Sequence, residues 1–214
     1  MRINILLTAL IILLFCFSKS PAQDSAKDNL IHFNYTILAG SKVTVFGSTN
    51  INEFSCFSEE TWENPGPELI SSPLTDKATF KNAVIKIRTE SLNCGNEVMN
   101  QNLCTTMESD QFPYIIIELA EASSSHLQSI QLNGQSVLSA KVYITLAGKR
   151  LAQLISVNES GIGTGIYHFT GNHRMLLSDY GIDPPKAFFG LIKVHDAITV
   201  QFDLMVSMQK ELTP

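Results

Sequence analysis

The chain has 214 residues, with 15 lysines and arginines against 20 aspartates and glutamates, and a formal net charge of −5 at pH 7. This acidic balance argues against nucleic acid or an anionic membrane as a partner, because both attract basic proteins. The length suits a single domain with one well-buried core.

Residues 1–22 have the pattern of a secretory signal peptide, with a basic start at Arg2, an apolar run and small residues up to Ala22. The apolar run is shorter than the roughly 20 residues that a transmembrane helix needs. A large aromatic residue precedes Cys16 where a lipidation signal needs a small one, so ordinary cleavage is favoured. We therefore expect cleavage near Ala22, no transmembrane segment, a periplasmic or secreted protein, and a flexible leader over residues 23–30.

Short runs of alternating apolar and polar residues are found throughout residues 31–210, which we assign to one domain. The expected strands are Lys42 to Phe46, Glu53 to Ser58, Thr79 to Arg88, Tyr114 to Ala120, Val137 to Leu146, Arg150 to Val157 and Gly165 to Met175. The clearest strand comes last, because large apolar residues occupy every second position from Ile198 to Met208.

Turn signals separate these strands. Asn133-Gly134 is a strong hairpin signal, because both residues tolerate positive φ. Gly148-Lys149 and the looser segment Asn158 to Gly163 predict the next two turns. Consecutive hairpins build an antiparallel meander, so we expect an all-β, antiparallel up-and-down barrel of about eight strands.

One helix is expected near residues 96–109, capping or flanking the barrel. Its apolar stripe consists of Met99, Leu103 and Met107. Farther along, the segment Lys186 to Leu191 follows two prolines and predicts a loop or short turn. There Phe188 and Phe189 are expected to fold over the barrel mouth.

Three cysteines remain after cleavage, namely Cys56, Cys94 and Cys104. An oxidising compartment makes one disulfide plausible. A helix over residues 96–109 rises about 1.5 Å per residue, which carries Cys104 out of disulfide reach of Cys94. The favoured pair is therefore Cys56 with Cys94, and the alternative that all three are buried thiols stays open.

The sequence contains no pattern typical of a catalytic or metal site. His168 and His173 lie close together, but their spacing places them on opposite faces of one strand, where they cannot share a metal ion. No serine or cysteine lies in an activating motif. We therefore expect no enzymatic activity, no metal and no cofactor.

One polar cluster stands at a predicted strand end, with His173 and Arg174 beside Ser178 and Asp179. Arg174 could hold an anionic or polar headgroup, because guanidinium suits phosphate geometry. The favoured interpretation is structural: Asp179 caps the turn and pairs with Arg174.

Three segments in order across roughly residues 35 to 208 carry a family resemblance. They are the turn Ser178-Asp179-Tyr180-Gly181-Ile182, the strand end Glu90 to Gly95 with the following helix and Phe112-Pro113, and the Ile-Thr-Leu-x-Gly run within Val142 to Gly148. Together they resemble the YceI-like polyisoprenoid-binding family. One departure is Met99-Asn100, where many members carry a charged pair.

The resemblance implies a lipocalin-like barrel that holds a polyisoprenoid or other long-chain lipid for transport, storage or sequestration. Ligand-binding candidates, chosen for bulk and strand position with Arg174 added for a headgroup, are Phe46, Phe54, Ile85, Ile117, Ile144, Phe169, Arg174, Leu177, Phe202 and Leu204. The alternative is a filled barrel that acts as a structural or protein-interaction module of the cell envelope, without a lipid ligand. A homodimer is compatible with either function.

Overall fold

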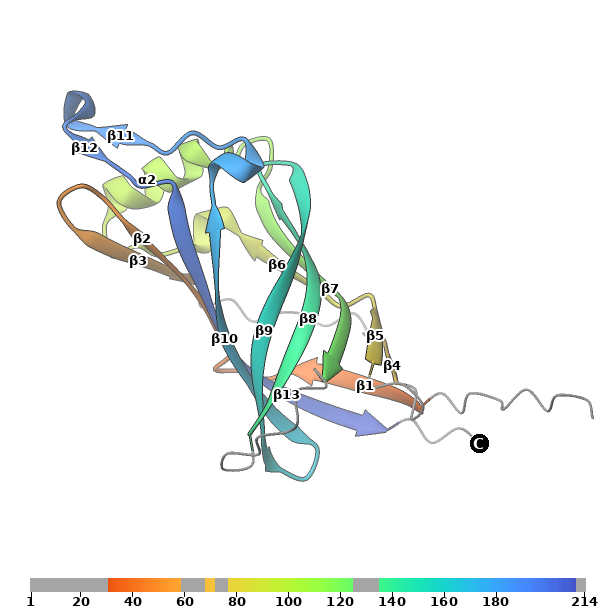
Figure 1. Ribbon diagram of the computed structural model, residues 1–214. Coiled ribbons are helices and arrows are strands. Elements are labelled where there is room, and N and C mark those ends of the chain that lie inside the picture. The colour runs from red at the N-terminus through yellow and green to blue at the C-terminus, as the bar shows by residue number, and fades with distance from the viewer. Residues whose placement is uncertain (1–30, 59–67, 72–76, 125–134, 211–214) are drawn as a thin grey trace, which may run out of the picture.

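The computed structural model describes residues 31–58, 68–71, 77–124 and 135–210. These residues form a large antiparallel sheet, a small two-stranded hairpin and one α-helix (Figure 1). The signal peptide and leader predicted over residues 1–30 lie outside the described residues. The strands of the large sheet are β1 (Ile31–Ile37), β2 (Lys42–Ser48), β3 (Glu53–Ser58), β4 (Glu68–Ser71), β5 (Lys77–Lys81), β6 (Val84–Arg88), β7 (Tyr114–Ser124), β8 (Gln135–Leu146), β9 (Lys149–Gly163), β10 (Ile166–Leu176) and β13 (Ala197–Lys210).

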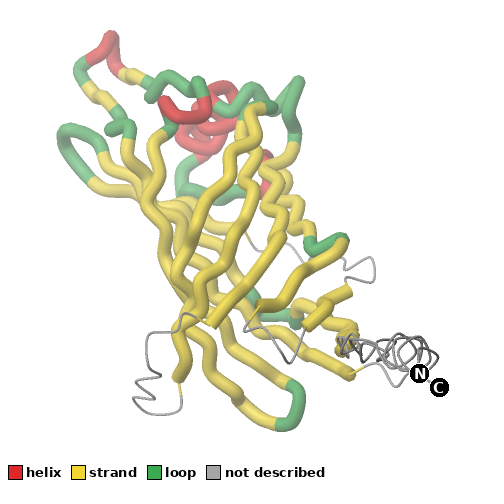
Figure 2. The backbone as a smooth tube through the Cα atoms, turned by 45° about the vertical axis from the view of Figure 1, so that its right-hand side comes forward, coloured by secondary structure: helices red, strands yellow, loops and turns green. Residues whose placement is uncertain are grey.

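Eight of these strands form a closed ring. β1 pairs with β4, β4 with β5, and β5 with β7. Strands β7 to β10 then pair in chain order, and β13 pairs with β10 on one side and with β1 on the other. Every pair is antiparallel, and Figure 2 shows the strands wrapped together with the helices at one end. The predicted all-β antiparallel barrel of about eight strands is confirmed.

β10 pairs with one edge of β13, and two strands share its other edge. Its first half, from Thr199 to Asp203, pairs with β2, and its last residues, from Val206 to Lys210, pair with β1. The β2–β3 hairpin therefore extends the barrel wall at the end where β13 begins. On the far side of the barrel, β6 pairs with β7 and extends the wall in the same way.

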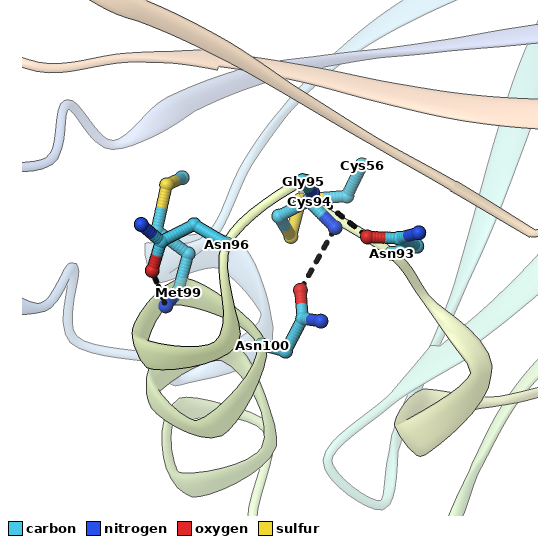
Figure 3. Close-up of a disulfide and its surroundings, with 7 residues drawn as sticks. All are labelled: Cys56, Asn93, Cys94, Gly95, Asn96, Met99 and Asn100. Atoms are coloured by element: carbon cyan, nitrogen blue, oxygen red, sulfur yellow. Dashed lines mark hydrogen bonds between the residues drawn. A yellow bond between two sulfur atoms is a disulfide. The ribbon is translucent and has the colours of Figure 1, made fainter.

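A covalent bond joins the two extensions of the barrel wall, the β2–β3 hairpin and the segment that follows β6. After β6 and a short 3₁₀ turn (Thr89–Ser91), the chain returns to β3, where the Phe57 N–H donates to the Asn93 carbonyl at 3.1 Å and the Asn93 N–H donates to the Phe57 carbonyl at 2.9 Å. A disulfide links Cys56 to Cys94 at this point (Figure 3). This is the pair that the helix geometry favours, and Cys104 is the free cysteine among the described residues.

The predicted helix is present as α2 (Glu97–Thr106). Asn96 caps its start, because its side-chain oxygen accepts from the N–H groups of Val98 at 2.9 Å and Met99 at 3.3 Å. The Asn100 side chain accepts from the Cys94 N–H at 2.8 Å, so the helix is tied to the disulfide (Figure 3). The helix flanks one end of the barrel. A cluster of buried apolar side chains fills the interior at this end. Its members at that end include Met107, Leu146, Met175, Leu177, Tyr180 and Ile182.

One predicted strand and one predicted turn are placed differently in the structure. The single strand expected from Thr79 to Arg88 is divided into β5 and β6, because the chain turns at Asn82 with φ of 58°. The turn expected from Asn158 to Gly163 is part of β9, and the chain turns after it at Gly165. A Cβ at Gly165 would lie 2.9 Å from the Met208 carbonyl oxygen, and its φ is +76°, so this turn requires glycine. The hairpin signal Asn133-Gly134 lies outside the described residues.

The expectation that Phe189 folds over the barrel mouth is wrong. β11 (Lys186–Ala187), a 3₁₀ turn and β12 (Ile192–Lys193) form a small hairpin. Asn50 holds this hairpin to the β2–β3 turn, because its side chain donates to the Leu191 carbonyl at 2.9 Å and accepts from the Lys193 N–H at 2.8 Å. The tip therefore projects away from the barrel (Figure 1). Phe189 is fully exposed.

Removing the disulfide should destabilise the protein without removing its fold. The bond joins residues 38 positions apart, and closing such a loop in the unfolded chain stabilises the fold by about 4 kcal/mol. The double variant Cys56→Ala/Cys94→Ala should lose this free energy of unfolding in urea titrations, whereas Cys104→Ser should lose little. Equal midpoints for the double variant and the wild type would contradict this structural role.

Candidate functional site

A cavity of about 410 Å³ lies inside the barrel. Its volume falls within the range of small-molecule binding sites. Side chains from nine strands, β1, β2, β5 to β10 and β13, line it. The long strands contribute alternate residues, namely Leu138, Ala140, Val142 and Ile144 from β8 and Val200, Phe202, Leu204, Val206 and Met208 from β13. The lining is therefore largely apolar.

Two backbone features shape this lining. In β7, Ile117 and Leu119 face the cavity, and a register shift after Leu119 brings the even-numbered Ala122 to it as well. In β10, Gly171 lies opposite Phe202, and a Cβ there would come within 2.5 Å of the Phe202 ring. Glycine at this position therefore makes room for the ring that forms part of the cavity wall.

Six of the ten predicted ligand-binding residues line the cavity. They are Ile85, Ile117, Ile144, Phe169, Phe202 and Leu204. All six lie on the inward face of their strands, where sequence alternation placed their apolar side chains. Whether they bind a ligand stays a prediction.

The other four predicted residues do not line the cavity. Phe46 is 42% exposed, on the face of β2 opposite Val43. Phe54 packs over Gly47 on the neighbouring strand, and Leu177 is buried in the cluster that fills the helix end of the barrel. Arg174 is exposed, on the opposite face of β10 from His173. These four positions are therefore structural or external.

Sequence reasoning missed the first strand. Tyr35 and Ile37 of β1 line the cavity, and burial raises the pKa of the Tyr35 hydroxyl, so the ring is uncharged at neutral pH. The Tyr35 ring also meets Phe80 edge to face at 6.1 Å between centroids. The alternation of Phe33, Tyr35 and Ile37 was the available signal.

His173 is the imidazole of the cavity lining. Its Nε2 lies 3.2 Å from the Gln153 Oε1, and the Gln153 Nε2 donates to the Tyr180 hydroxyl at 3.2 Å. Burial lowers the pKa of His173, so the ring is uncharged at neutral pH. His168 lies on the outer face of the same strand, 2.7 Å from Asp203, as the spacing of the two histidines predicts.

The polar turn after β10 is capped differently from the prediction. Asp196, not Asp179, accepts from the Ser178 N–H at 2.8 Å and from the Ser178 hydroxyl at 2.6 Å. These hydrogen bonds lower the pKa of Asp196. Among the described side chains, Asp179 forms no ion pair with Arg174. The predicted cap is wrong because the acceptor is the residue just before β13, 18 positions farther along the chain.

Two features are absent from the described residues. No group of three or more histidine, cysteine, aspartate or glutamate side chains there could hold a metal ion. Within the same residues, no helix has the length and apolar character to span a membrane.

The barrel resembles solved structures although its sequence is remote from them. No family model and no curated protein matches the chain. BcnA from Burkholderia cenocepacia superposes with a TM-score of 0.58 at 13% identity, over 77% of this chain and 95% of BcnA. A polyisoprenoid-binding domain from Saccharophagus degradans, implicated in plant cell wall breakdown, superposes with a TM-score of 0.57 at 11% identity, over 83% of this chain and 98% of that domain. The chain therefore shares the fold of these two proteins.

The lowered pKa of His173 predicts a pH-dependent contribution to stability. Because the unfolded chain binds the proton first, this contribution is complete above the unfolded pKa of about 6.5 and is lost as pH falls through the folded pKa. The stability difference between wild type and His173→Gln should therefore shrink from pH 7.5 to pH 5 in urea titrations. A difference that stays constant across this range would show that the ring titrates as it does in water.

Proposed function

We propose that the protein is a YceI-like, extracytoplasmic binding protein that holds a long-chain amphiphile, such as a polyisoprenoid lipid, inside its barrel for transport, storage or sequestration. The single observation that carries the proposal is the apolar cavity lined by side chains from nine strands. The shared fold with a polyisoprenoid-binding domain and the sequence resemblance to the YceI-like family support it.

Apolar contact alone provides the affinity that this function needs. Each methylene removed from water contributes about 0.8 kcal/mol, so roughly ten buried groups of a prenyl chain gain about 8 kcal/mol before the costs of association. The prenyl chain has no donors or acceptors, and the inward faces of β8 and β13 present few polar atoms that would lose water. The cavity therefore suits a hydrocarbon chain better than a polar metabolite.

The proposed location outside the cytoplasm rests on two observations. The first residues have the composition of a secretory signal peptide. The disulfide between Cys56 and Cys94 is a bond that persists in oxidising compartments and is rare in the cytosol.

Binding is favoured over catalysis by the surroundings of the imidazole. A general base needs a reacting hydroxyl or thiol, or an orienting carboxylate, within hydrogen-bond reach. Within the described residues, His173 contacts the amide of Gln153 instead. The alternative of a filled structural barrel requires side chains to occupy the interior, and the cavity argues against it.

Filling the cavity should abolish lipid uptake. Ala140 is 4% exposed and faces the cavity from β8, so Ala140→Phe places a ring where the chain would lie. We expect at least a tenfold weaker affinity for a C20 prenol in fluorescence-competition titrations. Leu154→Phe is the matched control, because Leu154 lies on β9 and is 70% exposed. Equal affinity in a folded Ala140→Phe variant would contradict the proposed site.

A buried charge should have the same effect for a different reason. Ile144→Glu or Phe202→Glu places a carboxylate against the bound hydrocarbon, which cannot solvate it. Each variant should lose detectable prenol binding while circular dichroism shows an intact sheet. Retained binding by either folded variant would mean that the lining is assigned wrongly.

A further inference from the structure

Among the polar side chains of the described lining, His173 is held by a hydrogen-bond network that leaves one of its ring nitrogens unused. The Nε2 of His173 is engaged by Gln153, and Gln153 is in turn fixed by the buried Tyr180 hydroxyl. The other ring nitrogen, Nδ1, has no partner among the described residues, although His173 lines the cavity. The imidazole is therefore held in place at one nitrogen and open to a ligand at the other.

The network also sets which role Nδ1 plays. The Gln153 oxygen that faces His173 can only accept, so Nε2 carries the hydrogen. In an uncharged imidazole the second nitrogen is then an acceptor with a free lone pair. Its complement is a hydrogen-bond donor, such as a hydroxyl group.

The charges of the lining disfavour a phosphate. Lys77 and Glu159 are the charged side chains among the described lining residues, and they have opposite signs. Lys77 is exposed at the start of β5, and Glu159 accepts from the Ser136 hydroxyl at 2.6 Å. Arg174, the guanidinium nearest in sequence to His173, is exposed on the other face of the strand. A phosphate beside His173 would lose water, and the lysine of the described lining, Lys77, is exposed on β5 and is not among the hydrogen-bond partners of His173.

We propose that His173 is a specificity-determining residue: its Nδ1 accepts a hydrogen bond from the hydroxyl of a bound long-chain alcohol, and the cavity selects this uncharged head over a phosphorylated one. This inference rests on the proposed lipid-binding function and names the class of head that the site takes. The hydrocarbon chain of the lipid supplies most of the affinity, and its hydroxyl group fixes its orientation in the cavity.

The size of the effect follows from the kind of bond. A hydrogen bond between neutral groups changes an equilibrium constant by about threefold to tenfold. The alcohol should therefore bind about threefold to tenfold more tightly than the hydrocarbon of the same chain. The phosphate ester should bind more weakly than either.

The experiment compares three C20 probes, geranylgeraniol, its deoxygenated hydrocarbon and geranylgeranyl phosphate, on wild type and His173→Phe. The phenyl ring preserves most of the imidazole volume, so hydrocarbon affinity should stay within twofold while the preference for the alcohol disappears. Tyr35→Phe is the matched control, since it removes the hydroxyl of another uncharged polar residue of the lining. That variant should keep the preference.

Three results would overturn the inference: His173→Phe keeps the preference for the alcohol, Tyr35→Phe loses it, or the phosphate binds wild type as tightly as the alcohol does. Each of these still leaves the protein a lipid binder. If wild type takes up none of the three probes, the proposed function itself fails and the inference fails with it.

Discussion

The pairing of β13 with β10, β2 and β1 is the constraint on which the rest of the structure depends. This strand closes the ring, and its two partners on one edge give the barrel a wider wall at one end than at the other. Because side chains alternate along a strand, the same pairing turns Val200, Phe202 and Leu204 inward together. The pairing of β13 therefore both closes the barrel and forms the wall of the cavity. A shift of its register by one residue would turn its apolar face out of the interior.

The two ends of the barrel differ in chemistry. At the helix end, Met107, Leu177 and Tyr180 fill the interior, and the disulfide and Asn100 tie α2 to the wall. Farther along β8 the inward residues Val142 and Ala140 are smaller, and the cavity lies against them. The cavity is thus a consequence of where small residues stand on an otherwise apolar inner face. The polar side chains of the cavity lining are few, and most of them are uncharged or exposed. This pattern is expected of a site for a long hydrocarbon chain with a single polar head.

Much of the fold follows from local pattern. The alternation in β8, β10 and β13 predicts strands and their inward faces, so the interior candidates from those strands lie where they were expected, with Ile144, Phe169 and Phe202 on the cavity. The failures are non-local. Leu177 is apolar because it packs at the helix end of the barrel. The cap of Ser178 comes from Asp196, just before β13, and Asn50 fixes a hairpin more than a hundred residues away. The register shift in β7 changes which residues face inward, and no periodicity reveals it.

The central claim is that the barrel interior holds a long-chain lipid, and native mass spectrometry of the mature protein, purified from its own source without detergent, tests it most directly. The account predicts a discrete added mass that organic solvent releases as a long-chain amphiphile. A bare polypeptide mass, together with no uptake of added polyprenyl lipids, would contradict it and favour a barrel that acts through protein partners.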